Sequence, residues 1–137
     1  MRDPIGLTAT RFGMTDPQKI VFRSLLAGKS GTLHHGCCVG GDAEGHRIAR
    51  EAGYRIVGHP PLYPSFRAQL DCDELRPEQH YLTRNRNIVN ETEALIAVPR
   101  EDEEQIHSGT WMTYRYAMKT KKPVVLILPD GSTRAVR

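Results

Sequence analysis

The chain has 137 residues, of which 39% are hydrophobic and 26% are charged, as in an ordinary globular protein of one domain. Nineteen basic and 16 acidic residues give a net charge of +3, an excess that is small for a nucleic-acid partner. No apolar run reaches the ~18 residues of a membrane helix, and residues 1–4 do not begin a secretion signal. We therefore expect a cytoplasmic protein without a membrane partner, and the odd count of three cysteines fits a reducing compartment.

Short β-like runs alternate with helix-like runs along the chain, which is typical of a parallel α/β protein. The expected strands are 5–10, 32–35, 54–58, 94–98 and 123–128. The expected helices are 16–27, 43–52, 84–93 and 108–121, with Asp16, Asp42, Thr83 and Ser108 as capping residues. The proline-rich stretch 59–79 is expected to be mostly loop. The pattern predicts a single Rossmann-like domain over 1–137, a three-layer α/β/α sandwich with a mostly parallel sheet.

In an open parallel sheet, ligands bind outside the carboxyl ends of the strands. Four segments end a strand there and carry residues unusual for a connector, so they supply the candidate ligand-binding residues. These are Thr8, Thr10, Arg11, Gly36, Cys37, Gly40, Gly41, Asp42, Arg84, Asn85, Arg86, Pro99, Ser108, Gly109, Thr110 and Trp111.

The strongest local signal is a pair of arginines, Arg84 and Arg86, just after the expected cap Thr83. The first turn of a helix has a partial positive charge and normally prefers acidic residues. Two arginines there are explained if an anion docks on the helix N-terminus. The alternative is that both are surface side chains paired with Glu91 or with the acidic run 101–104.

The segment Ser108-Gly109-Thr110 fits the same chemistry, because Gly109 permits close approach of a phosphate and the two hydroxyls can donate to it. The alternative is an ordinary serine N-cap. On the helix that follows, Trp111, Tyr114 and Met118 form one stripe and Met112 and Tyr116 another. We expect the second stripe to face the sheet, and the first to be core or a subunit contact rather than a platform for base stacking.

The glycine-rich loop 36–42 matches neither GxxxxGK[ST] nor GxGxxG, which disfavours a P-loop NTPase and a dinucleotide dehydrogenase. A metal site among His34, His35, Cys37, Cys38 and His46 is also disfavoured. Neighbouring strand residues point to opposite faces, and neither CxxC nor HExxH spacing is present. We therefore expect no metal and no cofactor, and interpret the cysteines as small buried side chains.

Together these motifs resemble the SLOG superfamily, named for the DprA/SMF DNA-processing proteins and the LOG nucleotide phosphoribohydrolases. The stretch 35–42, HGCCVGGD, is similar to its glycine-rich second-strand loop. The stretch 83–89, TRNRNIV, with 93–99, EALIAVP, resembles its "RN…hydrophobic-P" segment. The stretch 108–111, SGTW, with 122–125, KPVV, resembles its "GGxGT…KP" end.

The resemblance implies a nucleotide-type ligand whose phosphate meets the Gly109-Thr110 helix start, beside the glycine loop and the two arginines. It also implies a homo-oligomer, a dimer or larger. The hydrolytic branch resembles PGGxGTxxE, and Thr113 stands here at the position of the glutamate. Threonine cannot supply a carboxylate for acid–base catalysis, so the catalytic residues are left unassigned.

The leading interpretation is therefore binding of a phosphorylated nucleotide or nucleotide-derived signal, for sensing or sequestration. The alternative is an enzyme, a LOG-like N-glycosidase acting on nucleoside monophosphates. Binding of single-stranded nucleic acid ranks last, since its basic cluster, Lys119, Lys121 and Lys122, also suits an ordinary helix C-terminus.

Overall fold

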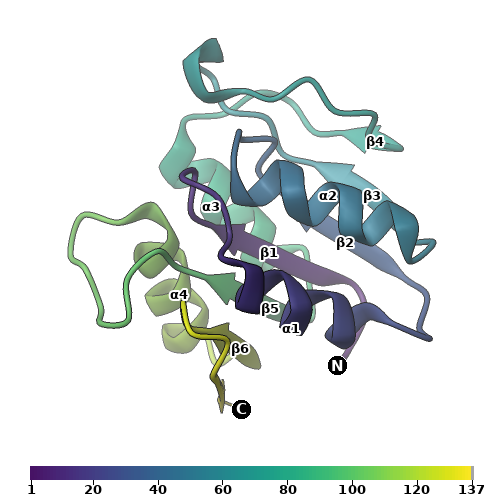
Figure 1. Ribbon diagram of the computed structural model, residues 1–137. Coiled ribbons are helices and arrows are strands. Elements are labelled where there is room, and N and C mark those ends of the chain that lie inside the picture. Colours follow the sequence, from purple (N-terminus) through teal and green to yellow (C-terminus); the bar gives the residue numbers. More distant parts are fainter. Residues whose placement is uncertain (137) are drawn as a thin grey trace.

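A seven-stranded sheet forms the centre of the molecule in a computed structural model, which describes residues 1–136 (Figure 1). The strands lie in the order β4-β3-β2-β1-β5-β6-β7, and only the β6–β7 pair is antiparallel among the pairs of the described chain. The strands are β1 (Ile5–Ala9), β2 (Thr32–His35), β3 (Arg55–Gly58), β4 (Glu74–Leu75), β5 (Ala94–Val98), β6 (Val124–Ile127) and β7 (Thr133–Val136). The predicted Rossmann-like class is confirmed, while β4 and β7 were not predicted.

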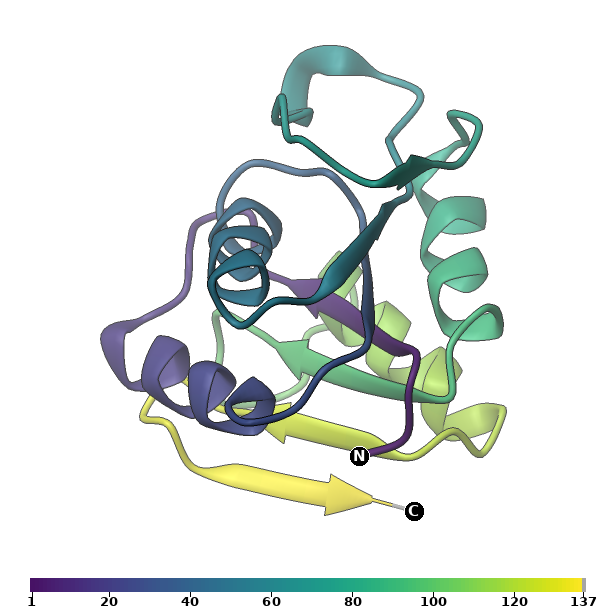
Figure 2. The same cartoon turned by 90° about the vertical axis from the view of Figure 1, so that its right-hand side faces the viewer.

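Helices cover both faces of the sheet (Figure 2). The helices are α1 (Asp16–Leu26), α2 (Gly41–Glu51), α3 (Tyr81–Asn90) and α4 (Gly109–Lys119), with a short 3₁₀ turn at Pro64–Phe66. Helices α1 and α2 pack with the sheet around one hydrophobic cluster, and α3 and α4 around a second. None of the helices described within 1–136 has the length and apolar character needed to span a bilayer.

Strand β5 explains how one run of residues supports both layers. All five of its residues are buried. Ile96 and Val98 belong to the cluster under α1 and α2, whereas Leu95 and Ala97 belong to the cluster under α3 and α4. Because successive strand residues point to opposite faces, a strand covered on both sides needs a continuous apolar run.

Helices α2 and α3 begin earlier than predicted, and α1, α2 and α3 each have an N-cap other than the predicted one. Thr15 caps α1 through a capping box with Gln18, so Asp16 is the first helical residue instead of the cap. Helix α2 begins at Gly41, and Asp42 is not its cap, because its carboxylate accepts the N–H groups of Gly36 and Cys38 at 3.1 and 3.2 Å.

Helix α3 is capped by His80, whose side chain accepts the Leu82 N–H, and Thr83 lies inside the helix. Arg84 is consequently the fourth residue of α3, and Arg86 is the sixth. The expected conflict between these two charges and the dipole of the first helical turn is therefore wrong. Contacts with other parts of the chain, rather than the helix N-terminus, must explain where these two arginines lie.

The first stripe of α4 lies in the core, which is one of the two places predicted for it, whereas the second stripe, predicted to face the sheet, lies beside α3 with only Tyr116 also packed against the core cluster. Trp111 is 1% exposed and lies in the core, and Tyr114 and Met118 pack partly against the same cluster. Met112 and Tyr116 line a shallow groove between α3 and α4. The first stripe is core, so it does not support the expected homo-oligomer, which remains a prediction.

Gln18 on α1 joins the ends of two central strands. Its side chain is fully buried, and Nε2 donates to the carbonyl oxygens of Pro99 and Ile127 at 2.8 and 3.0 Å. Its Oε1 accepts the Thr15 N–H at 2.9 Å. One amide thus satisfies the backbone just beyond β5 and at the end of β6, where the sheet stops.

His34 and His59 form a second buried polar pair, on β2 and directly after β3. Their Nδ1 and Nε2 atoms are 2.8 Å apart, and the two side chains are 4% and 2% exposed. Burial, followed by the neighbouring His34, lowers the pKa of His59 to about 3, and burial also lowers the pKa of His34. The folded protein therefore holds both rings neutral at physiological pH.

We predict that Gln18→Leu lowers the free energy of unfolding by about 2 kcal/mol, because two buried carbonyl oxygens lose their donor. Urea unfolding of both proteins measures this. Ile20→Ala, at a position 64% exposed on the same helix, is the matched control and should change stability by less than about 0.5 kcal/mol. An unchanged unfolding midpoint for Gln18→Leu would show that the amide does not hold the strands.

We also predict an acid-sensitive stability that depends on His59. An unfolded histidine titrates near pH 6.5, so between that value and about 3 only the unfolded chain takes up the proton. Stability contributed by the neutral ring is complete above this window and is lost as the pH falls through it. Lowering the pH from 7 to 4.5 should cost about 2.5 kcal/mol through this group. In His59→Gln the loss measured by urea unfolding should be smaller by that amount, and equal losses would contradict the assignment.

Candidate functional site

A cavity of about 710 Å³ opens at the carboxyl ends of the parallel strands. Its walls come from the residues that follow β1 and β5, from the loops after β2 and β3, and from the first turns of α3 and α4. This is the edge at which open α/β sheets bind ligands, and the volume lies in the range of small-molecule sites.

Most of the predicted residues meet on this cavity wall. They are Thr8, Thr10, Arg11, Gly36, Asp42, Arg84, Asn85, Ser108, Gly109 and Thr110. A Cβ placed on Gly109 would meet only Asn85 Nδ2, at 3.9 Å, so the backbone of this helix start faces open space. Ser108 caps α4 by accepting the Trp111 N–H, as its alternative interpretation expected, and it lines the cavity as well.

Six predicted residues do not line the cavity: Cys37, Gly40, Gly41, Arg86, Pro99 and Trp111. Gly40 and Gly41 pack against the backbone after β1, where Gly41 N–H donates to Thr10 O at 2.8 Å. A side chain at Gly40 would collide with the carbonyl of Arg11, so these glycines allow two loops to pack together.

The other four have structural contacts of their own. The Pro99 carbonyl oxygen accepts a hydrogen bond from Gln18 Nε2, and the buried Trp111 donates Nε1–H to Glu101 at 3.1 Å. Arg86 lies over the Tyr116 ring in the groove between α3 and α4. Cys37 turns toward Cys72 beneath the cavity wall. Arg84 thus lies in the cavity wall, whereas Arg86 lies in the groove between α3 and α4.

Arg84 is the arginine that reaches the glycine loop. It is 8% exposed, its Nη1 donates to the carbonyl oxygens of Gly36 and His59, and its Nε donates to Asn85 Oδ1 at 2.7 Å. These acceptors fix the guanidinium in the wall without a carboxylate. Nη2 has no partner among residues 1–136, and it belongs to a side chain that lines the cavity.

The mouth of the cavity is aromatic as well as basic, and Arg11 is the predicted residue among the four side chains that form it. Arg11 lies 4.5 Å from the centre of the Phe66 ring and 5.1 Å from that of Phe12, and Arg100 lies 4.1 Å from that of Phe12. Other wall residues that were not predicted are Leu7, Ala9, Cys38, Pro61, Leu62, Tyr63, Ser65, Tyr81, Ile88, Glu101 and His107. The run of bulky side chains at 62–66 within an otherwise polar loop was the available signal.

Three arginines face this space without an internal counter-ion. None of Arg11, Arg84 and Arg100 forms an ion pair with a carboxylate of residues 1–136. Glu101 shares the wall, and burial raises the pKa of Asp42, which opposes its ionisation. The cavity wall therefore carries more cationic than anionic side chains, and it also includes the apolar Leu7 and Ile88.

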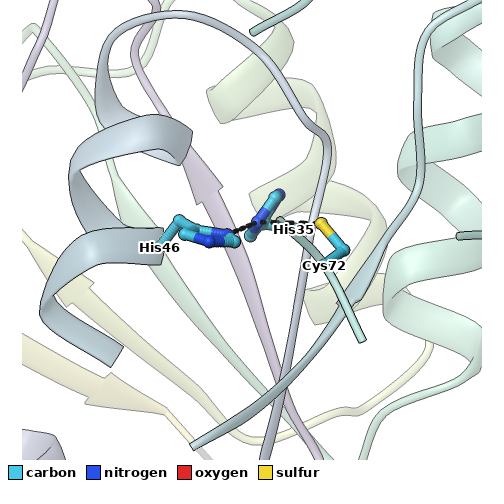
Figure 3. A group of neighbouring side chains, drawn as sticks. All are labelled: His35, His46 and Cys72. Atoms are coloured by element: carbon cyan, nitrogen blue, oxygen red, sulfur yellow. Dashed lines mark hydrogen bonds between the residues drawn. The ribbon is translucent and has the colours of Figure 1, made fainter. Parts of the chain in front are cut away.

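Two groups of side chains lie close enough to be considered as metal ligands: His35 with His46 and Cys72, and His34 with His59 and Glu91. In the first group, His35 Nε2 lies 2.9 Å from His46 Nδ1 and 4.0 Å from Cys72 Sγ (Figure 3). His34 and His35 do point to different partners, as their neighbouring positions on one strand predicted.

Proton positions in the first group oppose a cation on His35. The Cys37 backbone N–H donates to His35 Nδ1 at 2.9 Å, so the proton of the neutral ring lies on Nε2. That N–H in turn donates to His46 Nδ1, and His46 Nε2–H donates to Asp71 Oδ1 at 2.8 Å. No lone pair of His35 remains free, because a metal on Nε2 would require a proton on Nδ1. The group is a directed hydrogen-bond chain.

No protein-family model and no curated sequence matches the chain. Solved structures do. The molybdenum cofactor binding protein from the phototrophic bacterium Rippkaea orientalis has a TM-score of 0.69 and 23% identity, over 93% of this chain and 78% of that one. The Moco carrier protein from Chlamydomonas reinhardtii has a TM-score of 0.64 and 26% identity, over 91% and 76%.

A third similar structure is DNA processing protein A (DprA) from Streptococcus pneumoniae, with a TM-score of 0.63 and 17% identity, over 89% of this chain and 49% of that one. These proteins share the β-sheet and helix arrangement described above, and the fold implied by the glycine-loop and arginine motifs is confirmed. The chain has the SLOG-type Rossmann-like fold.

Proposed function

We propose that this protein binds a phosphorylated planar heterocycle in the cavity at the carboxyl edge of the sheet. Two sources share that chemistry: a nucleotide or nucleotide-derived signal, and a phosphorylated pterin such as the molybdenum cofactor. The observation that carries the proposal is the set of three arginines without internal counter-ions around one cavity of about 710 Å³.

The phosphate is best accommodated at the start of α4. The first N–H groups of a helix have no helical partner, and they favour an anion together with the helix dipole. Gly109 leaves room for it, and the hydroxyls of Ser108 and Thr110 lie on the same wall. Arg84 and Arg100 belong to that wall and can supply charge-assisted hydrogen bonds.

The heterocycle is best accommodated at the mouth, where Phe12 and Phe66 are 63% and 47% exposed. Aromatic rings and the guanidinium of Arg11 offer flat surfaces on which a planar ligand can stack. Molybdenum cofactor binding by two proteins of the same fold supports a ligand of this shape and charge.

Binding rather than hydrolysis is favoured by Thr113. Its side chain is buried and donates to the Gly109 carbonyl at 2.8 Å, inside α4, so it supplies neither a carboxylate nor a group facing the ligand. Glu101 is a half-buried carboxylate on the cavity wall, and one of its oxygens already accepts the indole N–H of Trp111. The N-glycosidase alternative therefore lacks the glutamate that its motif places at position 113.

Isothermal titration tests the proposal, with nucleoside monophosphates, cyclic nucleotides and ADP-ribose in one arm and anaerobic molybdopterin in the other. We expect Arg100→Ala to weaken binding about tenfold or more, because a hydrogen bond between two charged groups is lost. Arg86→Ala removes the same charge from α3 outside the cavity, and it should leave the dissociation constant unchanged within about twofold. Arg84 is unsuitable for this comparison because its replacement also releases the glycine loop.

Absence of binding in both arms would refute the proposal, and so would an equal effect of the two substitutions. Binding in one arm alone identifies the source of the ligand. Chromatography of the titrated samples adds a separate check, since free base released from a nucleotide would establish hydrolysis and overturn the assignment as a binding protein.

A further inference from the structure

Two of the three cysteines meet behind the cavity wall. Cys37 lies in the glycine loop, and Cys72 belongs to the segment between β3 and β4. Their sulfur atoms converge on one point beside Gly58, at 2.5 and 2.8 Å from the position that a Cβ there would take. The missing side chain of Gly58 is what provides the space for both sulfur atoms.

The two thiols differ in surroundings. Cys37 is 2% exposed, whereas Cys72 is partly exposed at the surface. His35 Nε2, whose proton is donated to His46, lies 4.0 Å from Cys72 Sγ. A hydrogen bond from the Cys37 thiol lowers the pKa of Cys72, and the same hydrogen bond together with burial raises the pKa of Cys37.

We propose that Cys37 and Cys72 form a redox-active dithiol that exchanges with low-molecular-weight disulfides, with Cys72 as the attacking sulfur and Cys37 as the resolving one. The geometry assigns these roles, since Cys72 is the less buried of the two residues and the sulfur of the buried Cys37 lies on the same side of Gly58 as the Cys72 sulfur. An attacking thiolate beside a protonated partner is the arrangement that thiol–disulfide exchange requires.

The reaction has two steps. The Cys72 thiolate attacks one sulfur of the disulfide RSSR, forms a mixed disulfide and expels RS⁻. Cys37 then loses its proton to the expelled thiolate and attacks the Cys72 sulfur, which forms the Cys37–Cys72 bond and expels a second RS⁻. One disulfide is reduced to one RSH and one RS⁻, and the protein dithiol is oxidised by the same two electrons.

Cys38 has a different environment although it is the next residue after Cys37. Its Sγ lies 3.6 Å from both the Gly36 carbonyl and Arg84 Nη1, and it belongs to the cavity wall. Burial raises the pKa of its thiol. Cys38 is therefore the matched control for a cysteine outside the dithiol.

Glutathione disulfide is the probe. The fully reduced protein is incubated with it, its remaining thiols are alkylated, and the intact mass and the modified peptides are measured. We expect the wild type to lose two alkylatable thiols as a Cys37–Cys72 disulfide. Cys37→Ser should instead accumulate one glutathione on Cys72, because the resolving sulfur is missing. Cys72→Ser should acquire neither, and Cys38→Ser should behave as the wild type.

Far-UV circular dichroism and thermal unfolding establish that each variant is folded, and Cys37→Ala replaces Cys37→Ser if the serine is not tolerated. The proposal is overturned if the wild type keeps three alkylatable thiols, if the disulfide includes Cys38, or if neither Cys37 variant traps glutathione on Cys72. Because the readout contains no cavity ligand, its outcome is independent of the proposed binding function.

Discussion

The hydrogen bonds of the Arg84 guanidinium to backbone carbonyl oxygens determine the shape of the carboxyl edge. Arg84 comes from α3, and its acceptors, Gly36 and His59, follow β2 and β3 directly. A nearly buried cation is costly unless its donors are satisfied, so this side chain fixes three chain segments relative to one another. Asp42 holds the same loop from the other side through two backbone N–H groups. Hydrogen bonds from Arg84 and Asp42 thus hold the glycine loop beside the cavity.

Strand β5 could be predicted from the sequence because burial on both faces leaves an unambiguous apolar run. Thr32–His35 and Ala94–Val98 lie where the pattern placed them. Helix starts were less predictable, because several side chains near each start can cap it. Asp42 and Thr83 have the chemistry of caps, but tertiary hydrogen bonds recruit the first, and the helix begins upstream of the second. Strand β7 was missed because its exposed residues carry no apolar alternation.

In the candidate site, backbone positions could be predicted from the sequence, whereas side-chain directions could not. Residues at strand ends, such as Thr8 and Gly109, could be placed because topology brings all carboxyl ends of a parallel sheet to one edge. Side-chain direction could not be read in this way, which is why Arg86 and Trp111 were assigned to a cavity that they do not reach. Phe66, at the aromatic mouth, lies on a long irregular segment. Such a segment has no sequence periodicity from which its contacts with the rest of the protein could be predicted.

That irregular segment has a consequence for how related chains can diverge. Leu62, Tyr63 and Phe66 shape the entrance, yet they are largely exposed and belong to neither hydrophobic cluster. Substitutions of these three residues change the shape of the entrance. They leave the two hydrophobic clusters that stabilise the sheet unchanged. Related proteins of this fold can consequently change their ligand preference by substitutions at the entrance without losing stability of the fold.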